Sequence, residues 1–313
     1  MVCNVEGKSS GVVIMPHWTP WHRMQTFVGE GVTLSRTTSF SLVDPNFVLS
    51  TKTLGQVLET ITNLEHLHLD IAQENNCDRE NFLRTALTIV ESTLSKNKNT
   101  LASITTNACS FRIIEAISSL PNLKVLVLTI PDTFEVMLYG MEHVRGEWPS
   151  LEVAVIKLQC FDPLRPRFVQ AFTDDTFPSM TSLAIIGSTP CCCVHAFLES
   201  HPSLDRLSFV TPDERFPFPP SYDFIMPPMN SLVELCITSR HYSYFCKNTQ
   251  PFLITLILYD EELPEVPFLL RNRQFLLGIY SSHAFPLLQY LVVRSTIDKY
   301  FELKFKPVDS LLV

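Results

Sequence analysis

The chain has little glycine, no long apolar run and no cluster of basic residues, and each shortage excludes a class of protein. Only nine of its 313 residues are glycine, which disfavours a fold built on tight glycine turns; the 22 prolines favour corners marked by proline. No run of about 18 or more apolar residues occurs, so the sequence predicts no membrane-spanning helix. The apolar run at residues 12–15 is too short for the core of a signal peptide.

The charge balance argues against a nucleic-acid partner. The chain has 24 Lys and Arg against 32 Asp and Glu, a net charge of −8. Proteins that bind a phosphate backbone gather Lys and Arg on one surface, and no such block is found in this sequence. We therefore expect no nucleic-acid and no membrane partner. A protein surface, and in particular a basic one, is the better electrostatic match.

Composition and cysteine usage indicate a folded protein with reduced thiols. Hydrophobic residues make up 46% of the chain, 22 residues are Phe, and only 18% are charged, which is not the signature of a disordered protein. The nine cysteines are an odd number in a sequence with no recognisable secretory signal, so we expect free thiols and a cytoplasmic or nuclear location. The length allows two globular domains or one elongated array.

A recurring leucine pattern is the strongest signal in the sequence. The pattern is L-x-x-L-x-L with conservative replacements, and its successive starts are 21 to 37 residues apart. Most of these intervals fall in or near the range of about 20–29 residues that leucine-rich repeats occupy. The two longest intervals, 64–101 and 253–288, are expected to hold loops or an extra helical turn. The starts are Leu64, Leu101, Leu123, Leu151, Met180, Leu204, Leu232, Leu253 and Leu288, with a weak first copy at Thr37.

Proline marks the same place in six of these repeats. It stands two residues before the start, where it disfavours helix in the preceding residue and has no N–H to donate. We therefore expect it to end a helix and to lead the chain into a strand. The prolines are Pro121, Pro149, Pro178, Pro202, Pro251 and Pro286. Helical spacing of apolar residues predicts helices within residues 54–61, 113–117, 134–141, 168–172 and 195–199.

Repeats of a helix, a corner and a short strand predict an α/β fold, a leucine-rich-repeat solenoid. The first, fourth and sixth positions of the pattern should point inward. The parallel strands should line the concave face of a horseshoe, with the helices on its convex face. We expect residues 1–31, with Trp18, Trp21 and His22, to form an N-terminal cap. The leucine-rich-repeat domain then spans residues 32–313, and residues 300–305 alternate as a last strand.

The repeats resemble those of fungal F-box leucine-rich-repeat proteins, whose repeats are related to those of ribonuclease inhibitor. The resemblance covers about residues 32–295, and it is carried by the segments PNLKVLVL, WPSLEVAVIKL, FPSMTSLAII, HPSLDRLSF and FPLLQYLVV. It implies a substrate-recognition subunit of a ubiquitin ligase of the SCF type. Two features depart from the pattern: most strands lack a following asparagine, and residues 1–31 contain no recognisable F-box. The adaptor contact would then have to come from sequence upstream or from a partner.

The third, fifth and seventh positions of each repeat give the predicted partner-binding face. We expect a polar first end, an apolar middle that also includes Ala184, and a mixed far end. Arg and Tyr are frequent hot-spot residues in protein interfaces, and exposed apolar patches often mark interaction sites. An alternative explanation is that β-branched residues simply suit parallel strands. The candidate residues are His66, His68, Asp70, Val125, Val127, Val153, Val155, Arg206, Glu234, Tyr259, Tyr290 and Arg294.

Other groupings offer weaker alternatives. Residues 191–193 are three adjacent cysteines followed by His195, which could support a thiol- or metal-dependent enzyme, but ordinary buried cysteines explain them better. The pair His66 and His68 with Asp70 could ligate a metal, although solvated surface histidines are the simpler interpretation. The acidic runs 174–175 and 260–262 lack EF-hand spacing.

No catalytic motif is found, so we expect a non-enzymatic protein without a metal or a cofactor. The segment 211–228, rich in proline and aromatic residues, is expected to be either a recognition loop or a packed connector. A scaffold without any link to ubiquitin remains the principal rival to the ligase interpretation.

Overall fold

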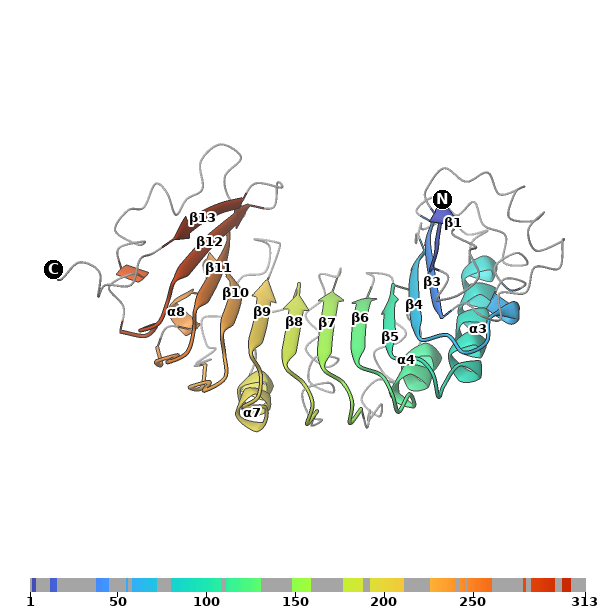
Figure 1. The fold of residues 1–313 in the computed structure, drawn as a ribbon, viewed down its shortest axis with the longest axis horizontal. Coiled ribbons are helices and arrows are strands. Elements are labelled where there is room, and N and C mark those ends of the chain that lie inside the picture. The colour runs from blue at the N-terminus through green and yellow to red at the C-terminus, as the bar shows by residue number, and fades with distance from the viewer. Residues whose placement is uncertain are drawn as a thin grey trace. The chain divides into compact units, whose positions relative to one another are not determined.

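The computed structural model describes about half of the chain, and this part falls into two compact units. Unit 1 is Met1–Leu151 and unit 2 is Glu152–Val313, and each is described by itself (Figure 1). The described residues are 2–3, 12–15, 38–44, 55, 58–71, 80–107, 111–130, 148–158, 177–187, 192–210, 226–239, 242–245, 247–260, 278–279, 283–295 and 300–304.

Unit 1 contains one sheet whose strands follow one another in chain order. The strands β2 to β6 pair in parallel, and the short β1 pairs with β2 in the antiparallel direction. The strands are β1 (Val2–Cys3), β2 (Val12–Met15), β3 (Ser39–Asp44), β4 (His66–Ile71), β5 (Ser103–Thr106) and β6 (Val125–Ile130).

Unit 2 has the same parallel arrangement, and its antiparallel strand comes last instead of first. The strands β7 to β12 are parallel neighbours in chain order, and the last strand, β13, is antiparallel to β12. The predicted strand at residues 300–305 is thus confirmed. The strands are β7 (Val153–Leu158), β8 (Ser182–Ile186), β9 (Arg206–Val210), β10 (Glu234–Thr238), β11 (Thr255–Asp260), β12 (Tyr290–Ser295) and β13 (Tyr300–Lys304).

The register of the parallel strands follows the leucine pattern position by position. In unit 1, the third position of one repeat pairs with the third position of the next, as in His66 with Ser103 and Ser103 with Val125. In unit 2 the same row runs from Val153 through the third positions of β8 to β11 and ends at Tyr290. A slip of one residue would turn every apolar side chain to the wrong face, so the leucines fix this register.

The predicted inward positions form the core of each unit. Leu64, Leu67 and Leu69 are at most 2% exposed, and so are the corresponding residues of the repeats that start at Leu204 and Leu253. Full burial of a Leu or Ile side chain contributes about 1.5–3 kcal/mol. One such repeat exposes its apolar side when alone, and only neighbouring repeats cover it. Stacking is therefore what stabilises the fold.

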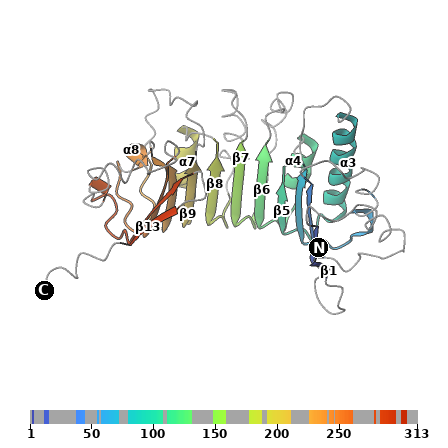
Figure 2. The same cartoon turned by 90° about the horizontal axis from the view of Figure 1, so that it is seen from above.

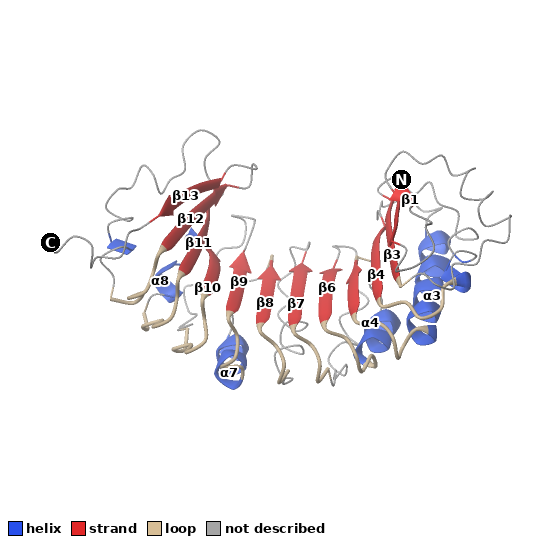
Figure 3. Cartoon of the chain, viewed as in Figure 1, coloured by secondary structure: helices blue, strands red, loops and turns tan. Residues whose placement is uncertain are grey.

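Helices cover one side of the strands in each unit, as Figures 2 and 3 show. Unit 1 has α3 (Glu80–Lys96) and α4 (Phe111–Ser118), while unit 2 has α7 (Cys192–Ser200) and the short α8 (Tyr242–Phe245). The helices α4 and α7 confirm the predictions at 113–117 and 195–199. Each unit therefore has the expected fold class, an α/β solenoid with parallel strands and helices on one face.

One expectation about the long intervals is wrong. The interval between Leu64 and Leu101 holds the 17-residue helix α3, where a loop or an extra turn was expected. Its signal is in the sequence, because Leu83, Leu87, Val90 and Leu94 follow helical spacing. Val90 and Leu94 are both 1% exposed. Residues 134–141 and 168–172, together with Trp18, Trp21 and His22, lie outside the described residues, so those predictions stay untested.

The proline corners are β-turns that end just before each strand. The residue before the proline accepts a hydrogen bond from the residue three positions later, as in His201 O from Leu204 N at 3.2 Å and Gln250 O from Leu253 N at 3.4 Å. Proline therefore takes the second position of the turn, where its fixed φ is favourable. After α7 ends at Ser200, the turn at Pro202 leads directly into β9, as the sequence predicted.

Buried polar side chains tie several of these corners to the preceding repeat. The carboxamide oxygen of Asn97 accepts from Leu64 N at 2.9 Å, and that of Gln250 accepts from Met229 N at 2.9 Å. His201 Nε2 accepts from Phe177 N at 2.8 Å. All three side chains are at most 2% exposed. Buried backbone N–H groups need such partners, and these three side chains supply them.

Candidate functional site

The side of the sheet opposite the helices is the candidate binding surface, and it is called the open face below. It consists of the third, fifth and seventh positions of the strands, the positions predicted to face solvent. In β6 and β8 the side chains alternate between half-buried at these positions and buried at the positions between them. The alternation arises because successive residues of a strand point to opposite sides of the sheet.

The open face of unit 1 begins with polar side chains. His66 is exposed, and His68 is half-buried. His68 Nδ1 lies 3.1 Å from the hydroxyl of Ser41 on the neighbouring strand. Ser103 and Thr105 continue the two rows on β5. The sequence prediction named the histidines and missed these hydroxyls, because the repeats starting at Thr37 and Leu101 match the leucine pattern poorly.

The same face becomes apolar at β6. Val125 and Val127 occupy the third and fifth positions and are half-buried. Asp70 stands in β4 at its seventh position, with its side chain outside the described part. The predicted order of polar and then apolar residues is therefore present within unit 1.

The open face of unit 2 starts with small apolar side chains. Val153 and Val155 on β7 and Ala184 on β8 are half-buried, and Val155 pairs with Ala184 in the register of the sheet. Lys157, at the seventh position of β7, is exposed. The two valines and the alanine are neighbours on this face, and accessible apolar residues of this kind often mark interaction sites.

Charged and aromatic residues follow on β9 to β12. Arg206 is exposed, and Glu234 beside it is half-buried. Tyr290 is 37% exposed, and Tyr259 is half-buried. Arg294 stands in β12 opposite Tyr259, with its side chain outside the described part.

A compact apolar cluster lies on the open face of unit 2 and was not foreseen. Val210, Cys236 and Ile257 occupy fifth or seventh positions, yet they are only 5–7% exposed, and Tyr259 and Val292 pack against them. Val292 and Ile257 are paired in register, as are Ile257 and Cys236. The cluster stabilises this part of the sheet. On the open face of unit 2, the smaller residues Val155 and Ala184 are more accessible than this cluster.

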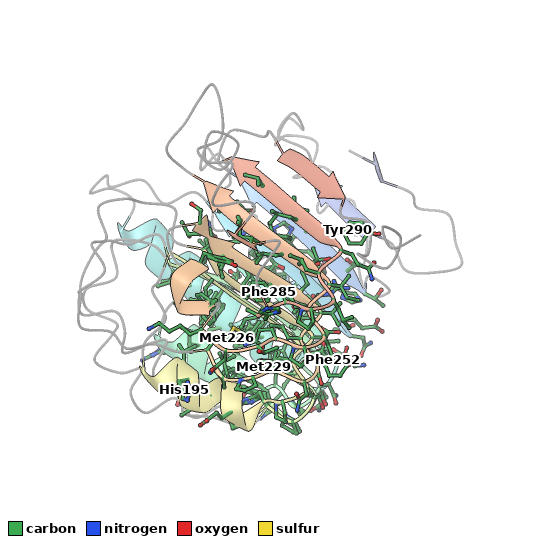
Figure 4. The ribbon with its side chains drawn as sticks, turned by 90° about the vertical axis from the view of Figure 1, so that its left-hand side faces the viewer. His195, Met226, Met229, Phe252, Phe285 and Tyr290 are labelled. Carbon is green, nitrogen blue, oxygen red and sulfur yellow. The ribbon has the colours of Figure 1, made fainter. Side chains whose placement is uncertain are left out.

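The exposed large apolar side chains of the described residues all belong to unit 2. Phe252 and Leu287 are both 49% exposed and precede the first leucine position of two adjacent repeats, and Val233 is 39% exposed. Figure 4 places Phe252 and Tyr290 toward the margin of the ribbon, and Met226 and Met229 nearer its middle. Val233 stands at the second position of its repeat, and Phe252 and Leu287 stand just before the first position of theirs; the leucine pattern marks neither place.

The environment of His201 shows how a titratable group is used inside unit 2. Its ring stacks on Phe197 with a centroid distance of 3.9 Å, and Nδ1 lies 2.7 Å from the carbonyl oxygen of Phe197. Because Nε2 accepts from a backbone N–H, Nδ1 must carry the proton of a neutral ring. Burial lowers the pKa of His201, and the hydrogen bond to Phe197 partly opposes this shift. The group is therefore structural.

The cysteine side chains of residues 191–193 lie outside the described part, so the alternative of a thiol or metal site stays untested. Cys192 and Cys193 begin α7, with their side chains outside the described part, and Cys191 also lies outside it. His195 Nε2 lies 3.3 Å from Glu199 on the same helix, and both side chains are exposed. Within the described residues, no three His, Cys, Asp or Glu side chains are grouped so that they could hold a metal ion.

Several other predictions fall on residues that the structure does not describe. The acidic residues 174–175 and 261–262 and most of the segment 211–228 are among them. Met226, near the end of this segment, and Met229, just after it, are at most 2% exposed. In the described part of the chain, no helix is both long and apolar enough to cross a membrane.

Comparisons with known proteins add a likeness in structure. No family model matches the sequence, and no curated protein matches it. Among solved structures, the chain is similar to the leucine-rich repeat-containing protein LegL7 from Legionella pneumophila. The two share 13% sequence identity over 93% of this chain and 92% of that one, with a TM-score of 0.48. The assignment of the fold rests on the strand order, the register and the burial described above.

Proposed function

We propose that this chain is a non-enzymatic recognition module that binds a protein partner on the open face of its strands. The observation that carries the proposal is the contrast between the two sides of the sheet. Inward positions are filled by leucines that neighbouring repeats bury, whereas the open face presents half-exposed Val153, Val155 and Ala184 with Arg206 and Glu234 nearby. Solenoids commonly bind partners on such surfaces, and Arg beside apolar residues is typical of interface hot spots.

A substitution at the centre of this surface tests the proposal. Ala184→Arg places a long charged side chain on the open face without changing an inward position, so the fold should remain intact. His195→Arg introduces the same residue on the exposed surface of α7 and serves as the matched control. Proteins retained from a cell extract by the wild type and by the control should be lost with Ala184→Arg, as measured by quantitative mass spectrometry.

The proposal is refuted if Ala184→Arg retains the same proteins as the wild type while circular dichroism shows it folded. Loss of all partners with His195→Arg as well would point to a different surface. Tyr290→Ala and Arg206→Ala then map the extent of the contact, since truncation of a hot-spot residue costs about 2 kcal/mol or more of binding free energy.

The finer version of the proposal is that the chain selects substrates for an SCF-type ubiquitin ligase. Its support is the resemblance of the repeats to fungal F-box leucine-rich-repeat proteins. Recovery of a cullin-ligase adaptor together with the full natural protein would favour this role. Binding of a partner without any adaptor, and without ubiquitination of that partner, would favour a scaffold or regulator instead.

A further inference from the structure

The strand β13 forms the C-terminal edge of the sheet of unit 2. It pairs with β12 along all five of its residues, from Tyr300 with Arg294 to Lys304 with Tyr290. Among the described residues, no strand pairs with its other side, and Figure 1 places it at the end of the row of strands. Alternate residues of an antiparallel edge strand direct their N–H and C=O groups away from the sheet. Such unpaired groups are a template for a further strand.

This edge lacks the features that usually prevent edge strands from associating. Protective edges are very short, bulged, interrupted by proline or marked by charges that point inward. The edge strand of unit 1 fits that description, since β1 (Val2–Cys3) has two residues. In β13, by contrast, Leu303 and Phe301 are in register with the buried Leu291 and Val293. The end of a solenoid usually needs a polar outer side, so apolar residues at these inward positions favour a further strand.

Exposed apolar side chains are found in the two repeats closest to β13. Phe252 and Leu287 are both 49% exposed and occupy the third position of the corner turns before β11 and β12. In earlier repeats the equivalent position holds Asn122 or Ser203. Their side chains donate hydrogen bonds to a carbonyl oxygen of the preceding repeat, at 2.7 Å and 3.1 Å. Apolar residues thus replace side chains that stabilise the corner, at the end of unit 2 where a second protein surface could cover them.

The sequence of β13 is complementary to itself when two copies run antiparallel. With a twofold axis at residue 303, Leu303 lies opposite Leu303 of the second copy, and Glu302 of each copy lies opposite Lys304 of the other. Residues opposite each other in such a pair are about 4.5–5.5 Å apart, so opposite charges attract. A twofold axis at residue 302 would instead place Glu302 opposite itself, which is unfavourable. The charges and the apolar positions therefore select the same register.

We propose that two copies of this chain associate through β13, with Leu303 opposite Leu303, so that the sheet of unit 2 continues into the second copy. An edge contact with twofold symmetry uses the same surface on both copies and stops at two. A second copy is the best-matched occupant, because β13 itself supplies the opposite charges and the apolar positions. The proposal goes beyond recognition on the open face: a dimer presents two such faces and would bind a multivalent partner more tightly than one chain.

Sedimentation velocity of the full chain tests whether the dimer forms. Over about 1–100 μM protein, the wild type should shift toward twice the mass of one chain as the concentration rises. Light scattering after size-exclusion chromatography measures the same mass independently. A monomer at every concentration would overturn the proposal. Assemblies that keep growing with concentration would also overturn it, because open-ended growth indicates a head-to-tail contact.

Charge reversal tests the register. Glu302 and Lys304 pair with outward positions of β12, so changes there leave the inward residues in place. Glu302→Lys brings two positive charges together at each crossing, and Lys304→Glu brings two negative charges together, so each should weaken self-association about tenfold. Both changes in one chain restore opposite charges and should restore the dimer. An equimolar mixture of the two single variants should form a heterodimer for the same reason.

Exposed charged residues elsewhere supply matched controls. Glu199→Lys on α7 and Lys98→Glu just after α3 change the net charge of the chain in the same two ways and should leave the dimer intact. Circular dichroism establishes that every variant is folded. Single reversals in β13 that dimerise like the wild type would overturn the proposal, and so would a double variant and a mixture that both stay monomeric. Ala184→Arg should remain dimeric, so the failure of partner binding and the failure of self-association are distinguishable.

Discussion

The two units follow the same residue pattern at the inward positions of the strands and differ at the outward positions. In both, most side chains at the first, fourth and sixth positions are apolar and buried, and the strands pair in the same register. On the open face, unit 1 presents hydroxyls and imidazoles, whereas unit 2 presents small apolar residues and a buried cluster around Cys236. The fold constrains the inward residues tightly and leaves the outward ones free to serve recognition.

The histidines give the clearest form of this contrast. His66 in unit 1 is exposed on the open face, where it can meet a partner. His201 in unit 2 is 2% exposed and is held by the backbone of two segments. The same residue type thus has a surface role in one unit and a structural role in the other. Location relative to the leucine pattern distinguishes them, since His201 directly precedes a proline corner.

The largest expected effect tests whether buried leucines at the inward positions stabilise both units to the same extent. Leu126→Ala in unit 1 and Leu207→Ala in unit 2 each remove a side chain at the fourth position that is at most 2% exposed. Each should lower the free energy of unfolding by about 2–5 kcal/mol, as measured by urea denaturation. Val127→Ala, at a half-buried outward position, is the control and should cost less. A small loss in only one unit would show that the two cores are not equivalent.

Loss of a buried side chain that accepts a backbone hydrogen bond should give the next largest effect. Asn97→Ala and Gln250→Ala leave the buried N–H groups of Leu64 and Met229 without their side-chain acceptors. Each change should lower the free energy of unfolding by about 1–3 kcal/mol. Asn122→Ala removes an exposed amide that bonds Asn99 O at 2.7 Å and should cost less than either. Equal losses for all three variants would contradict the importance of burial.

Acid should destabilise unit 2 through His201. Burial lowers the pKa of His201 in the folded protein, while the unfolded chain keeps the ordinary value of about 6.5. The unfolded state therefore binds more protons, so the stabilisation is complete above about pH 6.5 and decreases as the pH falls below it. Denaturation at several pH values measures the slope of the free energy of unfolding against pH. Gln250 accepts a backbone hydrogen bond at the equivalent place before Pro251. His201→Gln therefore supplies an amide that does not titrate, and the free energy of unfolding should depend less on pH. An unchanged slope would contradict the assignment.

The smallest effect concerns the proline corners. Pro121→Ala and Pro202→Ala restore chain freedom in the unfolded state at the second position of a turn. Each should lower the free energy of unfolding by about 0.4–1 kcal/mol, seen as a shift of the urea midpoint with an unchanged slope. Pro→Ala at the same place in both units should give similar losses. A gain in stability would mean that the proline is strained at that corner.

The sequence predicted the repeated elements well because leucine spacing and proline position are both local signals. It identified the inward residues, the direction of the strands and the corners before β8, β9 and β11. The helix α3 was not predicted, although Leu87, Val90 and Leu94 follow helical spacing, because it lies in an interval between repeats where the leucine pattern predicts only a connector. The hydroxyls on the open face of unit 1 were also not predicted, since Ser and Thr at outward positions have no pattern of their own.

The buried side-chain acceptors Asn97, His201 and Gln250 and the apolar cluster of unit 2 could not be predicted in the same way. A buried Gln or His looks like an ordinary surface residue in sequence, and only the structure shows which backbone group from the preceding repeat it meets. The position directly before a corner proline is the one available hint, and it holds His201 and Gln250 in unit 2. Cys236 gave no hint, since its burial depends on neighbours from three strands.

Each corner closes with its own hydrogen bond before the next strand begins, as at His201 and Gln250. The chain between one strand and the next corner is therefore free to differ in length, because the turn re-establishes the alignment each time. Such an array can gain, lose or exchange a repeat between two corners without disturbing the rest. Its recognition surface can consequently evolve one row at a time, while the interior that supports it stays the same.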